Sequence, residues 1–341
     1  MPPAVSVVIR SYERGAALIE LVEAVLRQRD APEFEIVVVE QSQRHSAEHA
    51  RRLAELERDP RVRILRHPPL GGPAARNVGS RASRGELLVF MDDDDLPGSD
   101  RWLARHVANF VDERCLAVTG RQLEPAKPPP SPRELARARR RVLSFIPILM
   151  WQCVYTIADR RRRIESVHGG NTSIRRSVLE RVGLWDECTT IEDEQSFNYR
   201  LRRGIRPGEY LVFDPRATMI RRRDIPGGMG KRDLRVASIG ARMFEFQHRV
   251  LAYYFPIRFV ALYPVYIAAL YVICVDWIWN DLHRQGSWLR RGLLSLGVLA
   301  AFPLLYASWG AGLIAQRIRR GPARRGIERV PILEPLAIVA R

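Results

Sequence analysis

Short apolar runs alternate with segments of helical spacing over the first 245 residues of the chain. The runs, which are rich in Val, Ile and Leu, predict buried strands at 5–9, 35–39, 62–65, 86–91 and 116–119. Between them, apolar residues recur every third or fourth position, which predicts helices at 16–27, 47–58, 73–82 and 101–111. Strands that alternate with helices build βαβ units. The pattern therefore predicts an α/β domain with a Rossmann-like, mostly parallel central sheet and flanking helices.

The composition changes near Glu124, and we interpret 124–165 as an insert in this domain. A proline-rich connector leads to a basic helix candidate at 133–141 and then to an apolar stretch at 142–157. Pro147 argues against one uninterrupted helix there. Two interpretations stay open. The stretch lies on an anionic membrane surface, or it packs in the core with basic, solvated ends.

Two uncharged runs, 259–275 and 292–315, mark the last third of the chain. A spanning helix needs roughly 20 apolar residues, so we expect a membrane hairpin of two helices at 246–316 and a basic cytoplasmic tail at 317–341. Arginines flank both outer ends, which favours a multi-pass protein of the cell membrane with the α/β domain, 1–245, in the cytoplasm. The alternative is a buried helical hairpin in a soluble protein.

Basic residues outnumber acidic ones, 55 to 38, and give the 341-residue chain a formal net charge of +17. Such a surplus suits nucleic acid, an anionic membrane surface or phosphorylated substrates, and charge alone does not choose among them.

Four consecutive acids, Asp92 to Asp95, follow the predicted strand at 86–91. Adjacent carboxylates repel one another, and the end of a buried strand is a costly place for them unless a cation or a functional site holds them. Carboxylate oxygens favour Mg²⁺ or Mn²⁺, which commonly bridge one or two carboxylates to a substrate's phosphates. The alternative is a solvated acidic turn. Ligands bind beyond the carboxyl ends of strands in such sheets, which favours a site.

Several further motifs, taken in order, resemble family 2 glycosyltransferases over roughly residues 4–215. They comprise the opening strand and loop 5–14, then 36–42, Gly72-Pro-Ala-Ala-Arg-Asn-Val-Gly79, 85–95, His168-Gly-Gly-Asn-Thr-Ser173, Val182-Gly-Leu-Trp-Asp-Glu187 and Glu192-Asp-Glu194. The resemblance implies a GT-A fold, a nucleotide-diphosphate sugar donor, a divalent metal and inversion at the anomeric carbon.

The same resemblance implies the donor side of the site. The family's Asp-x-Asp motif falls on Asp92 and Asp94, with Asp95 adjacent, so Mg²⁺ or Mn²⁺ would be held by these three. Alternatively Asp92 faces the ribose. The residues expected to bind the donor, with UDP as its nucleotide, are Ser11, Tyr12, Arg14, Glu40, Arg76 and Asp92.

An inverting transfer needs one base for the acceptor hydroxyl, and the family places it at Asp193. The alternative for Asp193 is an acid that stabilises the start of a helix. The expected acceptor-side residues are Gly170, Asn171, Trp185, Asp186 and Glu192, and for Trp185 simple packing is the alternative.

The chain departs from the family in several places. Arg10 and Glu13 stand where Pro and Asn are frequent, Glu40 replaces the usual Asp, and the arginines 221–223 stand where a His often follows. The Gln-x-x-Arg-Trp motif of processive synthases is missing, so we expect transfer of a single sugar.

The leading hypothesis is a membrane-anchored, inverting glycosyltransferase acting on a lipid-linked or surface-glycan acceptor at the cytoplasmic face, with no nucleic-acid partner. A nucleotidyltransferase would be expected to carry a Gly-rich, lysine-bearing loop after its first strand, and only Gly15 is there. A non-catalytic basic protein that binds membrane or nucleic acid leaves the acidic strand end unexplained.

Overall fold

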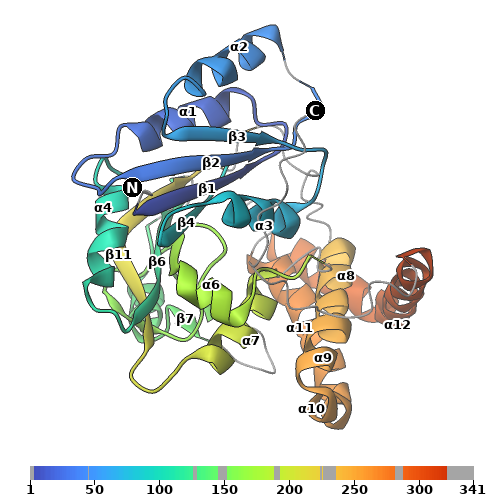
Figure 1. The fold of residues 1–341 in the computed structure, drawn as a ribbon. Coiled ribbons are helices and arrows are strands. Elements are labelled where there is room, and N and C mark those ends of the chain that lie inside the picture. Colours follow the sequence, from blue (N-terminus) through green and yellow to red (C-terminus); the bar gives the residue numbers. More distant parts are fainter. Residues whose placement is uncertain are drawn as a thin grey trace.

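The computed structural model describes residues 4–44, 46–125, 129–144, 152–187, 193–222, 225, 236–280 and 287–320. Figure 1 shows a sheet with helices on both of its faces and, beside it, a group of helices formed by the C-terminal third of the chain. The predicted α/β architecture is confirmed.

Nine strands form the main sheet in the described part of the chain, in the order β3-β2-β1-β4-β10-β6-β11-β5, with β9 also paired to β11. Their bounds are β1 (Val5–Ser11), β2 (Phe34–Glu40), β3 (Val62–Arg66), β4 (Leu87–Asp92), β5 (Asp95–Pro97), β6 (Cys115–Leu123), β9 (Arg162–Ile164), β10 (Thr172–Arg175) and β11 (Tyr210–Arg221). The first four strands along the order are parallel, as are β6 and β11. The strand β10 runs antiparallel between β4 and β6, and β5 and β9 run antiparallel to β11.

Helices cover both faces of this sheet. Their bounds are α1 (Ala16–Leu26), α2 (Ala47–Leu56), α3 (Gly72–Ala82), α4 (Trp102–Val107), the 3₁₀ turn η1 (Ala108–Val111), α6 (Arg176–Val182) and α7 (Asp193–Gly204). Val7 and Ile9 of β1 join the core beneath α1, α2 and α4, whereas Val8 joins the core beneath α6 and α7. Burial on both faces explains why the strands appear as continuous apolar runs.

The insert at 124–165 forms α5 (Pro132–Arg140), β7 (Leu143–Ser144) and β8 (Gln152–Cys153), and it ends in β9. Ala138, Val142 and Leu143 are buried in the core beneath α6 and α7. The described residues of the insert therefore fit the interpretation in which the stretch packs in the core. Residues 145–151 lie outside the described part, so both interpretations stay open for them.

The described residues of the C-terminal third, 236–280 and 287–320, are mostly helical. It comprises α8 (Val236–Phe246), the π-turn η2 (Gln247–Leu251), α9 (Ala252–Tyr254), α10 (Pro256–Ala261), α11 (Tyr263–Asn280) and α12 (Trp288–Arg320). The domain limit expected at 245 falls inside the helical stretch from α8 to α9. The helices α8, α11 and α12 pack around Phe244, Leu270 and Trp309.

The expected pair of membrane helices requires a correction. The first apolar run is divided at Leu262, between α10 and α11, and its apolar remainder Tyr263–Val275 covers about 20 Å, short of a roughly 30 Å hydrocarbon core. The stretch Trp288–Ala315 of α12, with 28 residues and a mean hydropathy of 1.7, is the one helix among the described residues that is long and apolar enough to cross. A multi-pass topology is therefore not supported.

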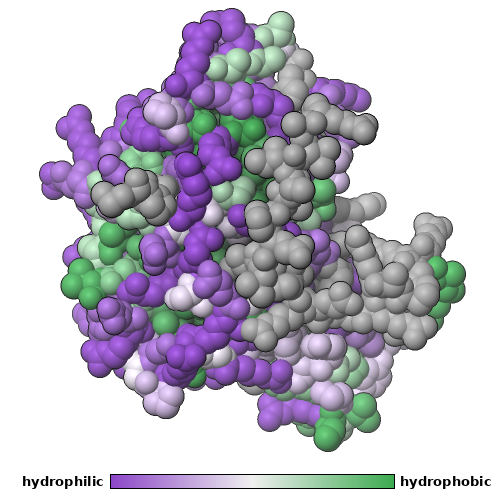
Figure 2. Space-filling model, viewed as in Figure 1, coloured by the Kyte–Doolittle hydropathy of each residue, from purple (hydrophilic) through white to green (hydrophobic). Residues whose placement is uncertain are grey.

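Apolar side chains are exposed on these helices. Ile257 and Val260 on α10 are 85% and 75% exposed, and Leu304 on α12 is 77% exposed. Figure 2 shows apolar surface over α12 and at the tip of α10, whereas most of the sheet domain presents polar side chains on this face. Such surface indicates contact with a membrane or a partner.

Asn171, directly before β10, connects α4, β6 and β11 through its side chain. Its Oδ1 accepts hydrogen bonds from the Trp102 indole (2.7 Å) and from His106 Nε2 (3.0 Å). Its Nδ2 donates to the carbonyls of Arg121 (2.9 Å) and Ala217 (3.0 Å). With φ at +53°, Asn171 occupies the left-handed region, which Asn tolerates better than most residues. Its amide therefore holds the backbone beside Gly170 in place.

We expect Asn171→Ala to lower the free energy of unfolding by about 3 kcal/mol, because it leaves the buried Trp102 N–H and two carbonyls without partners. Urea denaturation followed by tryptophan fluorescence measures this. Asn171→Gly, which removes the same amide but relieves the positive φ, should be about 1 kcal/mol less destabilised than the Ala variant. A wild-type midpoint for Asn171→Ala would contradict this role.

Candidate active site

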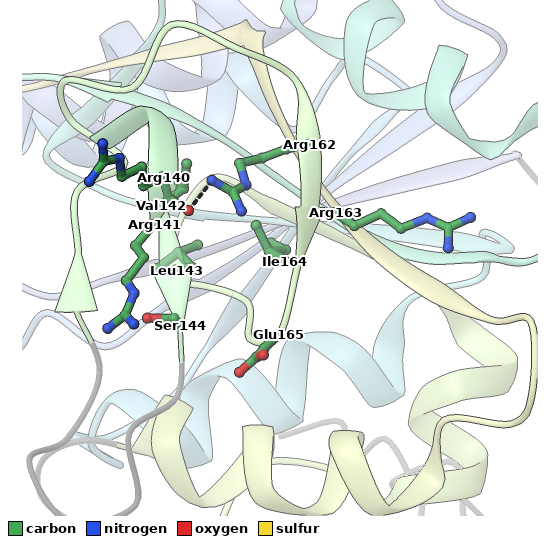
Figure 3. Close-up of a pocket in the computed structure, with 9 residues that line it drawn as sticks. All are labelled: Arg140, Arg141, Val142, Leu143, Ser144, Arg162, Arg163, Ile164 and Glu165. Carbon is green, nitrogen blue, oxygen red and sulfur yellow. Dashed lines mark hydrogen bonds between the residues drawn. The ribbon is translucent and has the colours of Figure 1, made fainter. Parts of the chain in front are cut away.

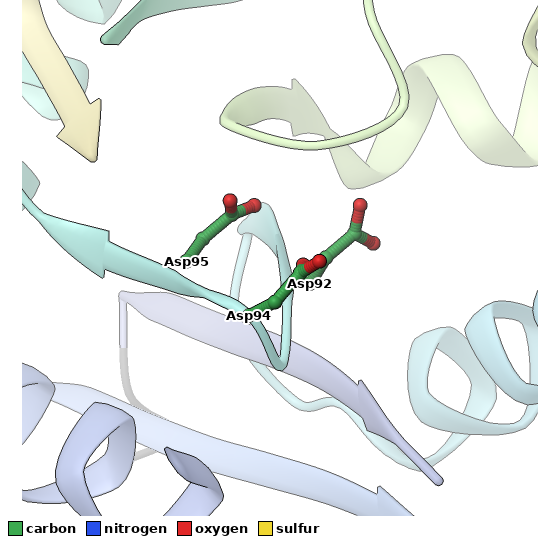
Figure 4. A group of neighbouring side chains, drawn as sticks. All are labelled: Asp92, Asp94 and Asp95. Atoms are coloured by element: carbon green, nitrogen blue, oxygen red, sulfur yellow. The ribbon is translucent and has the colours of Figure 1, made fainter. Parts of the chain in front are cut away.

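The acidic run lies where four strands of the sheet, β1, β4, β5 and β11, come together. Asp92 ends β4 and pairs in register with Arg10 of β1, and Asp95 begins β5 and pairs with Arg221 of β11. In Figure 4 the carboxyl groups of Asp92, Asp94 and Asp95 lie on the same side of the turn that joins β4 to β5. One oxygen from each lies within 4.8 Å of the others. This donor set, all carboxylate oxygen, fits Mg²⁺ or Mn²⁺.

Two arginines saturate the acids at the two ends of this turn. Arg221 donates from Nε to Asp95 Oδ1 (3.1 Å) and from one terminal nitrogen to Asp95 Oδ2 (3.2 Å) and Asp92 Oδ2 (3.1 Å). Arg10 Nε donates to Asp92 Oδ1 (2.8 Å). The side chains of Arg221 and Asp95 are 7% and 0% exposed, so this ion pair lies in the interior, where electrostatic forces are weakly screened.

The loop after β1 holds the two middle acids. The Tyr12 backbone N–H donates to Asp93 Oδ2 (3.0 Å), and Arg14 donates to Asp93 Oδ1 (3.2 Å) and Asp94 Oδ2 (3.3 Å). Arg14 also donates to the carbonyl of Ile225 (2.8 Å). Asp93 therefore fixes the loop from β1 against the acidic turn.

Burial and the arginines set the charge of this turn. Burial alone would raise the pKa of Asp92, but Arg10 and Arg221 outweigh it and hold the pKa well below its usual range. Burial raises the pKa of Asp93 to about 6. It also raises the pKa of Asp95 to about 7, against the effect of Arg221. Because Asp92 and Asp95 share one guanidinium, Asp92 keeps the negative charge and Asp95 takes up a proton more readily.

Two buried polar groups lie at the ends of the neighbouring strands. Ser11 of β1 and Glu40 of β2 are in register, and each is 2% exposed. Glu40 Oε1 accepts from the Ser42 N–H (2.6 Å). Among the described residues, neither Glu40 Oε2 nor Ser11 Oγ has a hydrogen-bond partner. Buried polar atoms are normally satisfied, so this pair indicates a place for a ligand's donor and acceptor groups.

Trp185 and Arg76 lie in the core behind β4. Trp185 is 2% exposed, with its ring stacked on Phe197 (4.7 Å) and in edge contact with Phe90 (4.6 Å). The Arg76 guanidinium lies 5.0 Å from the Trp185 ring centroid. These contacts show Trp185 as a packed core residue, which was the alternative to a direct contact with the acceptor. Asp186, also buried, accepts from Arg200 (3.4 Å).

The acceptor side is described only in part. A Cβ on Gly170 would lie 3.3 Å from Asp92 Oδ2, so the chain there passes directly beside the acidic turn. Asp193 is the first residue of α7, but its side chain lies outside the described part, as does all of Glu192. Their expected roles stay predictions.

Neither Arg10 nor His168 was among the site residues expected from the sequence. His168 Nδ1 accepts from the Gly170 N–H (3.2 Å), and Nε2 lies 2.9 Å from the Tyr155 hydroxyl. Burial lowers the pKa of His168 to about 4, so the ring is neutral and orients the turn beside Asp92. The arginines at 10 and 221 were visible as departures from the family pattern, but only strand pairing shows that both reach the aspartates.

A pocket of about 490 Å³ lies apart from this turn, between 140–144 and 162–165 of the insert. Figure 3 shows the guanidinium groups of Arg140, Arg141 and Arg163 pointing away from one another. Arg162 donates to the carbonyl of Arg139 (2.7 Å). The pocket thus lacks the convergent polar groups of a ligand site.

Sequence comparison finds short segments of similarity to curated bacterial proteins. The chain is 34% identical over 91 residues to an uncharacterized glycosyltransferase of Haemophilus influenzae, covering 26% of this chain and 29% of that protein. It is 32% identical over 99 residues to glycosyltransferase GlyG of Streptococcus pneumoniae (28% and 32%) and 33% identical over 100 residues to the succinoglycan biosynthesis protein ExoO of Rhizobium meliloti (29% and 28%). The matches span about a third of these relatives or less.

Comparison with solved structures identifies the fold. The chain superposes with a TM-score of 0.53 and 19% identity on a mannosyltransferase from Pyrobaculum calidifontis, solved with GDP-mannose and Mn²⁺, over 91% of this chain and 83% of that one. The two share the GT-A fold, as predicted.

The model of the family described as "Glycosyl transferase family 2" matches residues 6–183, more than half of the 341-residue chain. That match spans β1, the acidic turn and the strand β10 beside it. The chain belongs to glycosyltransferase family 2.

Proposed function

We propose that the protein is an inverting glycosyltransferase. It moves a single sugar from a nucleotide-diphosphate sugar to a lipid-linked or surface-glycan acceptor at the cytoplasmic face of the cell membrane. The observation that carries this proposal is the pair of buried, unpartnered atoms, Ser11 Oγ and Glu40 Oε2, beside a turn of carboxylates. Family membership favours this activity over the nucleotidyltransferase and the non-catalytic alternatives.

The donor would lie across the ends of β1, β2 and β4. Ser11 and Glu40 would bind the nucleoside, since they offer a hydroxyl and a carboxylate oxygen with no protein partner. Arg14 contacts Asp93 and Asp94 and would pair with the donor's phosphate. We expect UDP as the nucleotide, and the GDP-mannose of the structural neighbour makes GDP the next to test.

Asp92, Asp94 and Asp95 would hold Mg²⁺ or Mn²⁺. When bound, such an ion neutralises the charge that develops on the leaving nucleoside diphosphate. Arg76, buried behind the turn, adds to the positive field at Asp92 and supports the charge of the site from the core. Asp93 stays with Tyr12 and Arg14 and holds the loop in place.

Asp193 would take the proton from the acceptor hydroxyl. It begins α7, and the middle of this helix is fixed in place, because Phe197 stacks on Trp185 and Tyr199 packs against Tyr254. A rigid helix suits a base whose distance to the acceptor must be maintained. Gly170 and Asn171, with Asp186 and Glu192, would shape the acceptor side, and Trp185 would support it from the core.

The acceptor is proposed from the helices. The exposed apolar surface of α10 and α12 would place the sheet domain at a membrane, where lipid-linked sugars are found. The relative ExoO is named for succinoglycan biosynthesis, which is consistent with a surface-glycan acceptor.

A thermal-shift screen tests the donor site. UDP or GDP with Mn²⁺ should raise the melting temperature, because a ligand at 100 times its Kd stabilises the native state by about 2.7 kcal/mol. Glu40→Gln should lose most of the nucleotide's effect, because it replaces the unpartnered oxygen with a donor. Glu48→Gln, on the surface of α2, serves as the matched control. No shift with any nucleotide would contradict the donor site.

Asp193→Asn tests the base. The variant should lose transfer by roughly 10²- to 10⁴-fold, because a general base contributes about that much, while the affinity for the donor nucleotide stays within a few-fold. Radiolabelled-sugar transfer to membranes measures the rate, and Glu180→Gln on α6 is the control. Near-normal turnover of Asp193→Asn would remove Asp193 from this role.

Membrane attachment is tested on α12. Leu299 and Leu304 are 53% and 77% exposed, so arginine at both positions is tolerated in water but costs about 2.5–3.5 kcal/mol each near the centre of a bilayer. We expect wild type to stay in the membrane pellet after an alkaline carbonate wash, and the Leu299→Arg, Leu304→Arg variant to be released. The matched double Ala variant should stay. Release of wild type would show that α12 does not span.

A further inference from the structure

Arg221 occupies the position that a cation would take between two of the aspartates. It contacts both oxygens of Asp95 and one oxygen of Asp92, at 3.1 to 3.2 Å. The remaining oxygen of Asp92 accepts from Arg10. Every oxygen of Asp92 and Asp95 therefore has an arginine donor in the protein alone, although the same residues form the oxygen set that fits a divalent ion.

A divalent cation and Arg221 compete for these oxygens. A guanidinium does not lose its proton in proteins, so the repulsion between it and an arriving ion is not relieved by deprotonation. The side chain of Arg221 is 7% exposed, so water screens this repulsion poorly. The ion must displace Arg221 from the carboxylates or arrive with negative charge of its own.

The surroundings give Arg221 a second partner. With its amide turned so that oxygen faces the guanidinium, Gln122 accepts from Arg221 at 2.7 to 3.2 Å and donates to the Tyr155 hydroxyl at 2.8 Å. This neutral contact remains when the carboxylates turn to a metal. On the other side, a Cβ at Gly170 would lie 3.6 Å from Arg221 and 3.3 Å from Asp92, so glycine keeps the space beside the ion pair open.

We propose that Arg221 is a built-in counter-ion that takes the place of the divalent cation in the free protein, so that the cation binds tightly only together with a diphosphate. The negative charge of the diphosphate balances the positive charges of the metal ion and of Arg221. Without the diphosphate, the metal ion must compete with Arg221 for the carboxylate oxygens. This inference rests on the proposed function, since it concerns the metal and donor of that site.

Mn²⁺ binding, followed by the electron paramagnetic resonance signal of the free ion, tests the proposal without turnover. In wild type, saturating UDP (or GDP, if the thermal screen selects it) should tighten Mn²⁺ binding by roughly tenfold or more. Arg221→Gln should bind Mn²⁺ alone roughly tenfold more tightly than wild type, and the nucleotide should then add little. Arg222→Gln is the matched control, because it removes the same charge one residue away, where the guanidinium pairs with Glu20.

Two outcomes overturn the proposal: Mn²⁺ affinity in wild type that does not change with nucleotide, or Arg221→Gln that binds Mn²⁺ no more tightly than Arg222→Gln. Arg221→Lys keeps the positive charge but loses the two-pronged guanidinium contact. Its affinity for Mn²⁺ without nucleotide should lie between those of wild type and Arg221→Gln, so the proposal can still be tested if the Gln variant does not fold. If no variant binds Mn²⁺ with or without nucleotide, the metal use in the proposed function fails. If wild type binds Mn²⁺ tightly without nucleotide, only the proposed role of Arg221 is contradicted.

Discussion

The ion pairs between the acidic turn and the arginines are the constraint on which this site depends. Four adjacent carboxylates at the end of a buried strand are stable only with positive charge close by. The arginines that supply it are Arg10 in β1, Arg14 in the loop after β1, and Arg221 at the end of β11. Arg221 lies 126 residues after Asp95 in the chain. The turn therefore adopts its geometry only when the strands β3-β2-β1-β4 and the strands β6 and β11 are both in place.

The sequence was sufficient for those features that depend on local pattern. Apolar runs located β1 to β4 and β6, and the strand end located the aspartates, because both follow from periodicity and composition. Features that depend on long-range pairing were not accessible. Nothing local in Arg221 shows that β11 brings it against Asp95, and nothing in Trp185 shows that Phe197 and Arg76 cover its ring.

The two apolar runs of the C-terminal third show the limit of counting apolar residues. The run at 259–275 lacks charge, yet the chain turns at Leu262, and α11 packs with α8 and α12 rather than continuing α10. Hydropathy reports what a residue prefers to contact but not where a helix ends. The run at 292–315 does form one helix, α12, which continues through Pro303.

The contact between α7 and the C-terminal helices has a consequence for how the protein can be divided. Tyr199 lies in one apolar cluster with Phe246, Val250 and Tyr254, and Arg203 donates to the Tyr254 carbonyl at 3.0 Å. A fragment ending at 245 would remove the cover of Tyr199 on α7 and leave Arg203 without that carbonyl. The sheet domain and the helices at its side thus share an apolar cluster, and that cluster continues past residue 245.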